Sequence, residues 1–151
     1  MIRRFKFEDE VHQTLSCVPM AVRRKLDRVG VKLSLEQWQQ LGRGERLAIC
    51  HLPINDDEEI DALRLFIREA VKDRCGGATP KELPDEVRAA ADPPAHPPAL
   101  LVERARDVGI TLGEREWARL DSDERYALIK LGAGAEPSHN LAAGLRELLE
   151  R

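Results

Sequence analysis

A helical segment occurs twice in this chain of 151 residues, and the repeat limits the architecture more than any other feature. The segment from Val22 to Leu52 returns from Leu101 to Leu131. The identical positions are Val29, Gly30, Leu33, Trp38, Leu41, Glu45, Arg46, Ala48 and Leu52, which match Val108, Gly109, Leu112, Trp117, Leu120, Glu124, Arg125, Ala127 and Leu131. Because most of these residues are apolar, the repeat specifies packing and not a reaction. It predicts an all-α fold in which two units of about four short helices pack into one compact domain.

The signals for helix ends follow the same order in both copies. In the first copy, apolar residues recur at helical spacing up to Gly30, which can close a helix in the left-handed conformation. Ser34 then predicts the start of a short helix through Trp38, and a third helix stops before Pro53. Asn55 is the expected cap of a fourth helix, whose acidic first turn suits the helix dipole. No strands are predicted, because no segment alternates apolar and polar residues.

Prolines separate the two copies. Six of the nine prolines lie between residues 78 and 98. Proline lacks a backbone N–H and fixes φ, so this stretch cannot form one continuous helix. The predicted organisation is therefore an N-terminal helical unit at residues 1–77, a proline-rich linker at residues 78–98, and a C-terminal helical repeat unit at residues 99–151.

The cysteines and the apolar runs predict a cytoplasmic protein that holds no cofactor or metal. No apolar run approaches the roughly 20 residues that span a bilayer, and the start of the chain turns acidic where a signal peptide would be apolar. Cys17, Cys50 and Cys75 are odd in number and widely spaced, so reduced thiols are expected. Cys50 corresponds to Ile129 of the second copy, which favours a buried thiol over a metal ligand beside His51.

Charge is distributed unevenly along the chain. The net charge is −3, although residues 1–55 alone carry ten basic and six acidic residues. A compact basic cluster consists of Arg23, Arg24, Lys25, Arg28 and Lys32. The second copy has Val102, Glu103, Arg104, Asp107 and Thr111 at these positions, so the repeated fold does not need the whole cluster. We predict that these five residues bind a protein partner, and a solvated helix face is the simpler alternative.

Two neighbouring charges are repeated as well. Glu45 and Arg46 correspond to Glu124 and Arg125. A glutamate suits the first turn of its own helix, and the arginine can reach carbonyl groups at the end of the preceding helix. Each pair is therefore predicted to join two helices.

The sequence offers no group of residues that would make the protein an enzyme. A helix-turn-helix regulator is one alternative, because a recognition helix needs outward basic or amide side chains and the short helices around the tryptophans carry glutamines or arginines. The same helices also carry Glu36, Glu114 and Glu116, and these acidic residues count against DNA binding. A second alternative is a thiol- or metal-dependent protein that handles a cofactor through Cys17, since thiolates are stabilised near helix starts. Neither nucleic acid nor a membrane is expected as a partner.

An unusual run of neighbouring residues occupies the first half. It consists of Phe5-Lys6-Phe7-Glu8, Cys17-Val18-Pro19-Met20, Val22-Arg23-Arg24-Lys25-Leu26-Asp27, Gly30, Lys32-Leu33 and Trp38. In this run the chain resembles the conserved nitrate reductase-associated protein family. The resemblance implies a small cytoplasmic protein that assists assimilatory nitrate reductase in its maturation or activity. It implies nitrate reductase as the partner and brings no catalytic residues.

Overall fold

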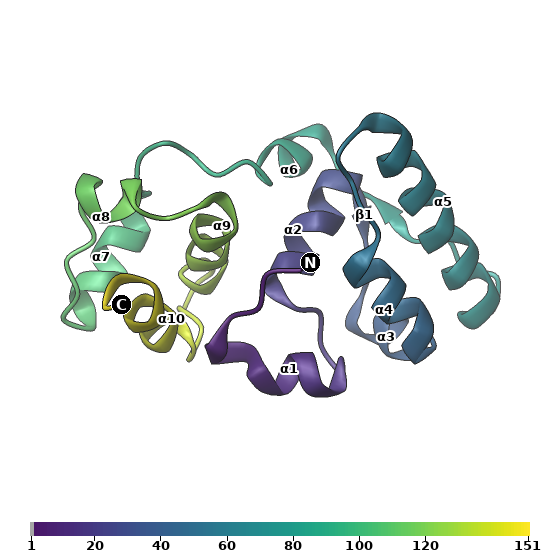
Figure 1. The fold of residues 1–151 in the computed structure, drawn as a ribbon, viewed down its shortest axis with the longest axis horizontal. Helices are drawn as coiled ribbons and strands as arrows, with labels where there is room; N and C mark the ends of the chain where they lie inside the picture. The colour runs from purple at the N-terminus through teal and green to yellow at the C-terminus, as the bar shows by residue number, and fades with distance from the viewer. Residues whose placement is uncertain (1) are drawn as a thin grey trace. The chain divides into compact units, whose positions relative to one another are not determined.

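Helices form nearly all of the regular structure in the computed structural model, which describes residues 2–151 (Figure 1). They are η1 (Lys6–Glu8), α1 (Asp9–Thr14), α2 (Met20–Val29), α3 (Leu35–Gln40), α4 (Arg43–His51), α5 (Asp57–Arg74), α6 (Asp85–Ala89), α7 (Ala99–Asp107), α8 (Glu114–Ala118), α9 (Ser122–Leu131) and α10 (Leu141–Leu149). Two short strands, β1 (Val31–Lys32) and β2 (Lys81–Glu82), pair antiparallel. The predicted all-α class is confirmed, and the prediction that no strands form is wrong for this small ladder. A strand of two residues is too short to show an alternating pattern.

The chain divides into two compact units. Unit 1 contains residues up to Arg4 and Glu10–Ala91, and unit 2 contains Phe5–Asp9 and Asp92–Arg151. The segment predicted as a linker, residues 78–98, includes β2 and α6, which belong to unit 1. The N–H of Leu83 also donates to the carbonyl of Gly30 over 2.9 Å. Backbone pairing thus attaches the first part of this segment to the end of α2.

The core of unit 1 forms where α2, α3, α4 and α5 bury their apolar faces. Of the residues predicted to pack there, Leu26, Val29, Trp38 and Leu41 are buried, and Leu33 is partly buried. Leu52 is 37% exposed, so its prediction as a core residue is wrong. Leu52 is the C-cap of α4 and has an extended backbone, with φ −64° and ψ 136°. An apolar position one residue past the last helical turn no longer follows the face of the helix.

Local sequence signals set most helix ends in unit 1. Gly30 has φ 82° and closes α2, as predicted. Ser34 caps α3 through its side chain, which accepts the N–H of Gln37. The cap of α5 is Asp56, not the predicted Asn55, because the Asp56 carboxylate accepts an N–H three residues later over 2.8 Å. Aspartate and asparagine are about equally good caps, so composition alone could not choose between these neighbours.

The two tryptophans make the same hydrogen bond in their respective units. The Nε1–H of Trp38 donates to the carbonyl of Leu15 over 2.8 Å, and the Nε1–H of Trp117 donates to the carbonyl of Pro94 over 3.0 Å. In both cases the acceptor lies 23 residues before the tryptophan. Both side chains are fully buried. Each indole therefore fills a core and fixes the segment before α2 in unit 1 or before α7 in unit 2.

The repeated glutamates close the starts of α4 and α9. Glu45 Oε1 accepts the backbone N–H three residues earlier over 2.7 Å and the Nε of Arg74 over 3.0 Å. Glu124 accepts the corresponding backbone N–H over 2.9 Å and both terminal nitrogens of Arg151, over 2.7 and 3.2 Å. The predicted role of the glutamates in the first turn is confirmed. In each unit the glutamate also binds an arginine: Arg74 is the last residue of α5, and Arg151 lies two residues after α10.

The repeated arginines hold different carbonyl groups. Arg125 donates from Nε to the carbonyl of Trp117 over 3.1 Å, and its guanidinium lies 5.5 Å from the centroid of that indole. This confirms the predicted contact with the preceding helix. Arg46 instead donates to the carbonyl of Leu15 over 2.8 Å, so the same prediction is wrong for unit 1. Both arginines nevertheless stabilise the surroundings of a tryptophan.

Candidate functional site

The predicted partner-binding cluster lies on α2 and β1 of unit 1. Arg23, Arg28 and Lys32 are exposed, and their side chains make no hydrogen bond or ion pair within residues 2–151. On a helix of 3.6 residues per turn, Arg23 and Arg28 project about 140° apart. These side chains therefore cover a broad area of the unit and do not form a single row.

Lys25 does not lie on this surface. Its side chain is 9% exposed, and its Nζ donates to the carbonyl of Cys50 in the last turn of α4 over 3.2 Å. Helical spacing explains the burial, because Lys25 is three residues after Val22 and four before Val29, both of which are in the core. Burial lowers the pKa of Lys25 below its ordinary value, and the smaller influence of Cys50 acts in the opposite direction.

Unit 2 has a cation at the corresponding position. Arg104, 79 residues after Lys25, donates to the carbonyl of Gly132 over 2.6 Å and to that of Ala135 over 3.0 Å. Gly132 is the C-cap of α9, so Arg104 binds carbonyl groups at and beyond a helix end. A cation near the C-terminus of a helix is favoured by the helix dipole. Lys25 and Arg104 thus stabilise the ends of α4 and α9, respectively.

Arg24 contributes both to the packing of unit 1 and to its surface. It is half-buried, and its Nε donates to the carbonyl of Ala91 over 2.8 Å. Ala91 is fully buried and lies two residues after the end of α6. Arg24 therefore attaches the segment after α6 to α2, and replacing it would disturb unit 1.

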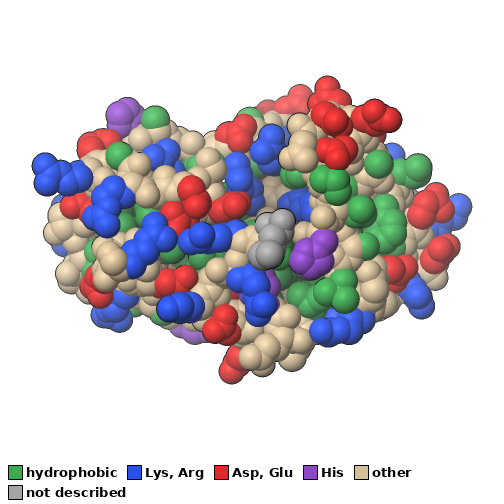
Figure 2. Space-filling view, viewed as in Figure 1, with side chains coloured by type: hydrophobic (Ala, Val, Ile, Leu, Met, Phe, Trp, Pro, Cys, Tyr) green, Lys and Arg blue, Asp and Glu red, His purple; other side chains and the backbone are tan. Residues whose placement is uncertain are grey.

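Two further basic residues, Lys81 and Arg88, lie beside the cluster, and sequence reasoning missed both. The strand register places Lys81 directly opposite Lys32. The side chain of Arg88, from α6, lies against Gly30: a Cβ atom at Gly30 would be 2.8 Å from Arg88 Nε. Figure 2 shows Lys and Arg side chains over α2 and α6 with acidic side chains beside them. Both residues fall in the segment predicted as a linker, and non-local contacts, the ladder among them, bring them to Gly30.

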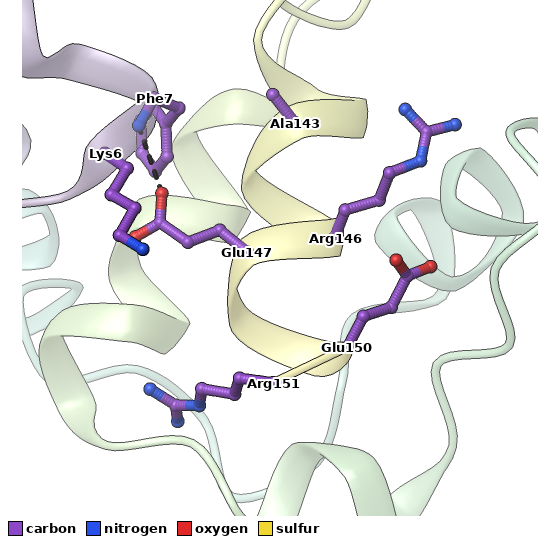
Figure 3. Close-up of a pocket in the computed structure, with 7 residues that line it drawn as sticks. All are labelled: Lys6, Phe7, Ala143, Arg146, Glu147, Glu150 and Arg151. Atoms are coloured by element: carbon purple, nitrogen blue, oxygen red, sulfur yellow. Dashed lines mark hydrogen bonds between the residues drawn. The ribbon is translucent and has the colours of Figure 1, made fainter.

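A shallow hollow of about 450 Å³ lies in unit 2 beside α10 (Figure 3). Two of its charged groups already have partners: Glu147 Oε1 accepts the N–H of Phe7 over 3.0 Å, and Arg151 binds Glu124. Figure 3 shows Arg146 and Glu150 projecting from α10 on the side opposite Glu147. The polar groups do not converge on one point as they would in a catalytic site.

The three cysteines are free thiols. Cys50 is 5% exposed and belongs to the core of unit 1, which confirms its prediction as a buried side chain. Burial raises the pKa of the Cys50 thiol, and the nearby Lys25 ammonium opposes the shift without cancelling it. Cys17 and Cys75 are partly exposed. Within residues 2–151, no three His, Cys, Asp or Glu side chains are grouped as metal ligands.

We expect the Cys50 thiol to react more slowly with thiol reagents than the thiols of Cys17 and Cys75. Because the thiolate is the reactive form, burial and a raised pKa should make Cys50 the slowest to react with a maleimide at pH 7.5. The rate at Cys50 should continue to rise above pH about 8.5, where an ordinary thiol is already half ionised. Peptide mapping after timed labelling measures the three rates. Labelling of Cys50 as fast as Cys75 would contradict the burial of this thiol.

A model of the conserved nitrate reductase-associated protein family matches residues 4–148. The chain belongs to this family. The match extends the family resemblance beyond the N-terminal run to both units, including the β2 and α6 segment that carries Lys81 and Arg88.

Searches of curated proteins and of solved structures found no match. None of the helices in residues 2–151 has both the length and the apolar composition that a membrane span requires. The association with nitrate reductase that the family name states is thus the functional information that the comparisons add.

Proposed function

We propose that this protein is a non-enzymatic, cytoplasmic accessory protein that binds assimilatory nitrate reductase and aids its maturation or activity. Membership of the family supports the choice of partner. The contact surface is proposed from three exposed cations on α2 and β1, which are Arg23, Arg28 and Lys32. Their side chains have no anionic partner within residues 2–151. Lys25 and Arg24 support this surface by holding α4 and the end of α6.

A surface of exposed positive charges can attract and orient a negatively charged partner. Exposed charges steer an oppositely charged partner into contact and restrict the orientations in which it binds. Their mutual attraction is screened over about 8 Å at physiological ionic strength. A complex held in this way should form quickly and weaken as salt is added.

The alternatives receive less support from the arrangement of residues. Cys17, the thiol on which a cofactor-handling role would depend, is partly exposed, but within residues 2–151 it belongs to no group of three His, Cys, Asp or Glu side chains that could hold a metal. The short helix α3, which would be the recognition helix of a DNA-binding protein, exposes Glu36 and buries Trp38. The negative charge of DNA would repel an acidic side chain on this helix.

Charge reversal tests the proposed contact. We expect Arg23→Glu with Arg28→Glu to weaken binding to purified nitrate reductase at least about tenfold at low salt, because two attractions become repulsions. The measurement is a titration of labelled protein with the reductase at two salt concentrations. Circular dichroism should show an unchanged fold, since exposed substitutions usually alter the free energy of unfolding by less than about 0.5 kcal/mol.

Unit 2 supplies the matched control. Arg106 and Arg119 are also exposed and have no side-chain partner within the described residues. Arg106→Glu with Arg119→Glu changes the net charge by the same amount and should leave binding within about twofold of the wild type, as expected for charges outside a contact. An equal loss in both double variants would mean that overall charge, and not this surface, controls binding.

A further inference from the structure

The strand ladder places two lysines in an unfavourable arrangement. Lys32 and Lys81 are directly opposite each other, and both are exposed. Side chains of opposed residues in an antiparallel pair project from the same face with Cβ atoms about 5 Å apart, and like charges there are destabilising. Within residues 2–151 neither ammonium forms an ion pair. The ladder thus presents two adjacent positive charges to solvent at the expense of its own stability.

Two arginines extend this positive area around Gly30. Arg28 precedes Gly30 by two residues and Lys32 follows it by two. The absent side chain of Gly30 makes room for Arg88, whose Nε, Cδ and Cζ would all lie within 3.2 Å of a Cβ atom at this position. Neither arginine has a side-chain hydrogen bond or ion pair in the part of the chain that the structure describes. We call Arg28, Lys32, Lys81 and Arg88 the Gly30 surface.

The acids near the Gly30 surface do not neutralise it. Glu82, the neighbour of Lys81, forms an ion pair with Arg68 of α5. Asp85 and Glu86 stand in the first turn of α6, where they suit the helix dipole, and the structure gives them no ion pair with Arg88. These acidic residues mark the edges of the positive area along β2 and at the start of α6.

We propose that the Gly30 surface binds a short acidic segment of a protein partner. The inference rests on the proposed function and adds to it the chemistry of the partner and two contact residues, Lys81 and Arg88. Carboxylates placed between Lys32 and Lys81 convert a repulsion into two attractions, and a guanidinium can bind a carboxylate in a bidentate manner. Four cations from α2, β1, β2 and α6 match a segment with several Asp or Glu residues.

A polypeptide fits this surface better than a nucleic acid does. Duplex DNA carries one charge per about 1.7 Å of its axis and continues past any small patch. Such a polyanion would meet Glu82, Asp85 and Glu86, all of which are exposed. A short acidic segment can end before it reaches them. The protein as a whole is also negatively charged, with a net charge of −3.

Lys81→Glu is the variant that tests the Gly30 surface, and Lys72→Glu is its control. Both lysines are exposed residues of unit 1 without a side-chain partner in residues 2–151, but Lys72 lies on α5. The probe is a fluorescent decaglutamate peptide, and its anisotropy is followed at low and moderate salt. We expect Lys81→Glu to weaken binding roughly fivefold or more and Lys72→Glu to change it less than about twofold.

Thermal unfolding distinguishes lost contact from lost structure. Lys81→Glu makes the cross-strand pair attractive, so its Tm should equal or exceed that of the wild type while peptide binding falls. Equal peptide binding by Lys81→Glu and Lys72→Glu would overturn the inference. Binding of a ten-nucleotide single-stranded DNA more tightly than the peptide would overturn the choice of a polypeptide ligand.

Titration with nitrate reductase separates the two proposals. If Lys81→Glu weakens peptide binding but the reductase binds neither the wild type nor any variant, the acidic ligand stands and the proposed partner fails. If Arg23→Glu with Arg28→Glu weakens reductase binding and Lys81→Glu does not, the proposed function stands and the Gly30 surface fails. Losses in both titrations would support both proposals.

Discussion

Trp38→Ala and Trp117→Ala should each lower the free energy of unfolding by about 3–5 kcal/mol, a large part of the stability of a small protein. Both indoles are fully buried, so each substitution leaves a cavity and removes a large apolar surface from the core. Each also removes the hydrogen bond that fixes Leu15 or Pro94. Urea denaturation followed by far-ultraviolet circular dichroism measures the loss.

Leu65→Ala supplies the control for these two substitutions. Leu65 lies on α5 and is 61% exposed, so its truncation should change the free energy of unfolding by less than about 0.5 kcal/mol. A loss below about 1 kcal/mol for both tryptophan variants would show that the indoles do not support the cores. A large loss for one variant alone would show that the two units depend on their tryptophans unequally.

Glu124→Ala should lower the free energy of unfolding by about 2–3 kcal/mol, more than Glu45→Ala, for which about 1 kcal/mol is expected. The Glu124 side chain is 2% exposed and binds Arg151 through both oxygens, whereas the Glu45 side chain is 24% exposed. Hydrogen bonds with charged groups contribute more when water is excluded. Each alanine variant also loses the side chain that accepts the backbone N–H at the start of its helix.

Urea denaturation of the two alanine variants provides the comparison, and Glu124→Gln adds a third measurement. Glutamine keeps an acceptor for the Asp121 N–H but loses the charge that binds Arg151, so its stability should fall between those of the wild type and Glu124→Ala. Equal losses for Glu45→Ala and Glu124→Ala would contradict the importance of burial. Full stability in Glu124→Gln would show that the charge is not needed.

Local chemistry made much of the helical structure predictable. Gly30 ends α2 in the left-handed conformation, and Ser34 caps α3, because these choices depend on a few neighbouring residues. The burial of both tryptophans followed from their place in an apolar pattern. These predictions needed no knowledge of distant contacts.

The candidate site was less predictable because its residues come from several elements. Helical spacing already places Lys25 beside Val22 and Val29, so its burial could have been found by following the phase of α2. Lys81 and Arg88 gave no comparable signal. Their position depends on a two-residue ladder and on the missing side chain of Gly30, and neither leaves a periodic pattern in the sequence.

Hydrogen exchange in the complex tests most directly whether this protein acts by binding nitrate reductase through unit 1. The exchange of backbone amides is compared with and without saturating reductase, and peptides are resolved by mass spectrometry. We predict slower exchange in peptides that cover residues 23–32 and 81–88, with little change in α7 to α10. Protection confined to α7 to α10, or no protection under conditions in which the complex forms, would contradict the proposed surface.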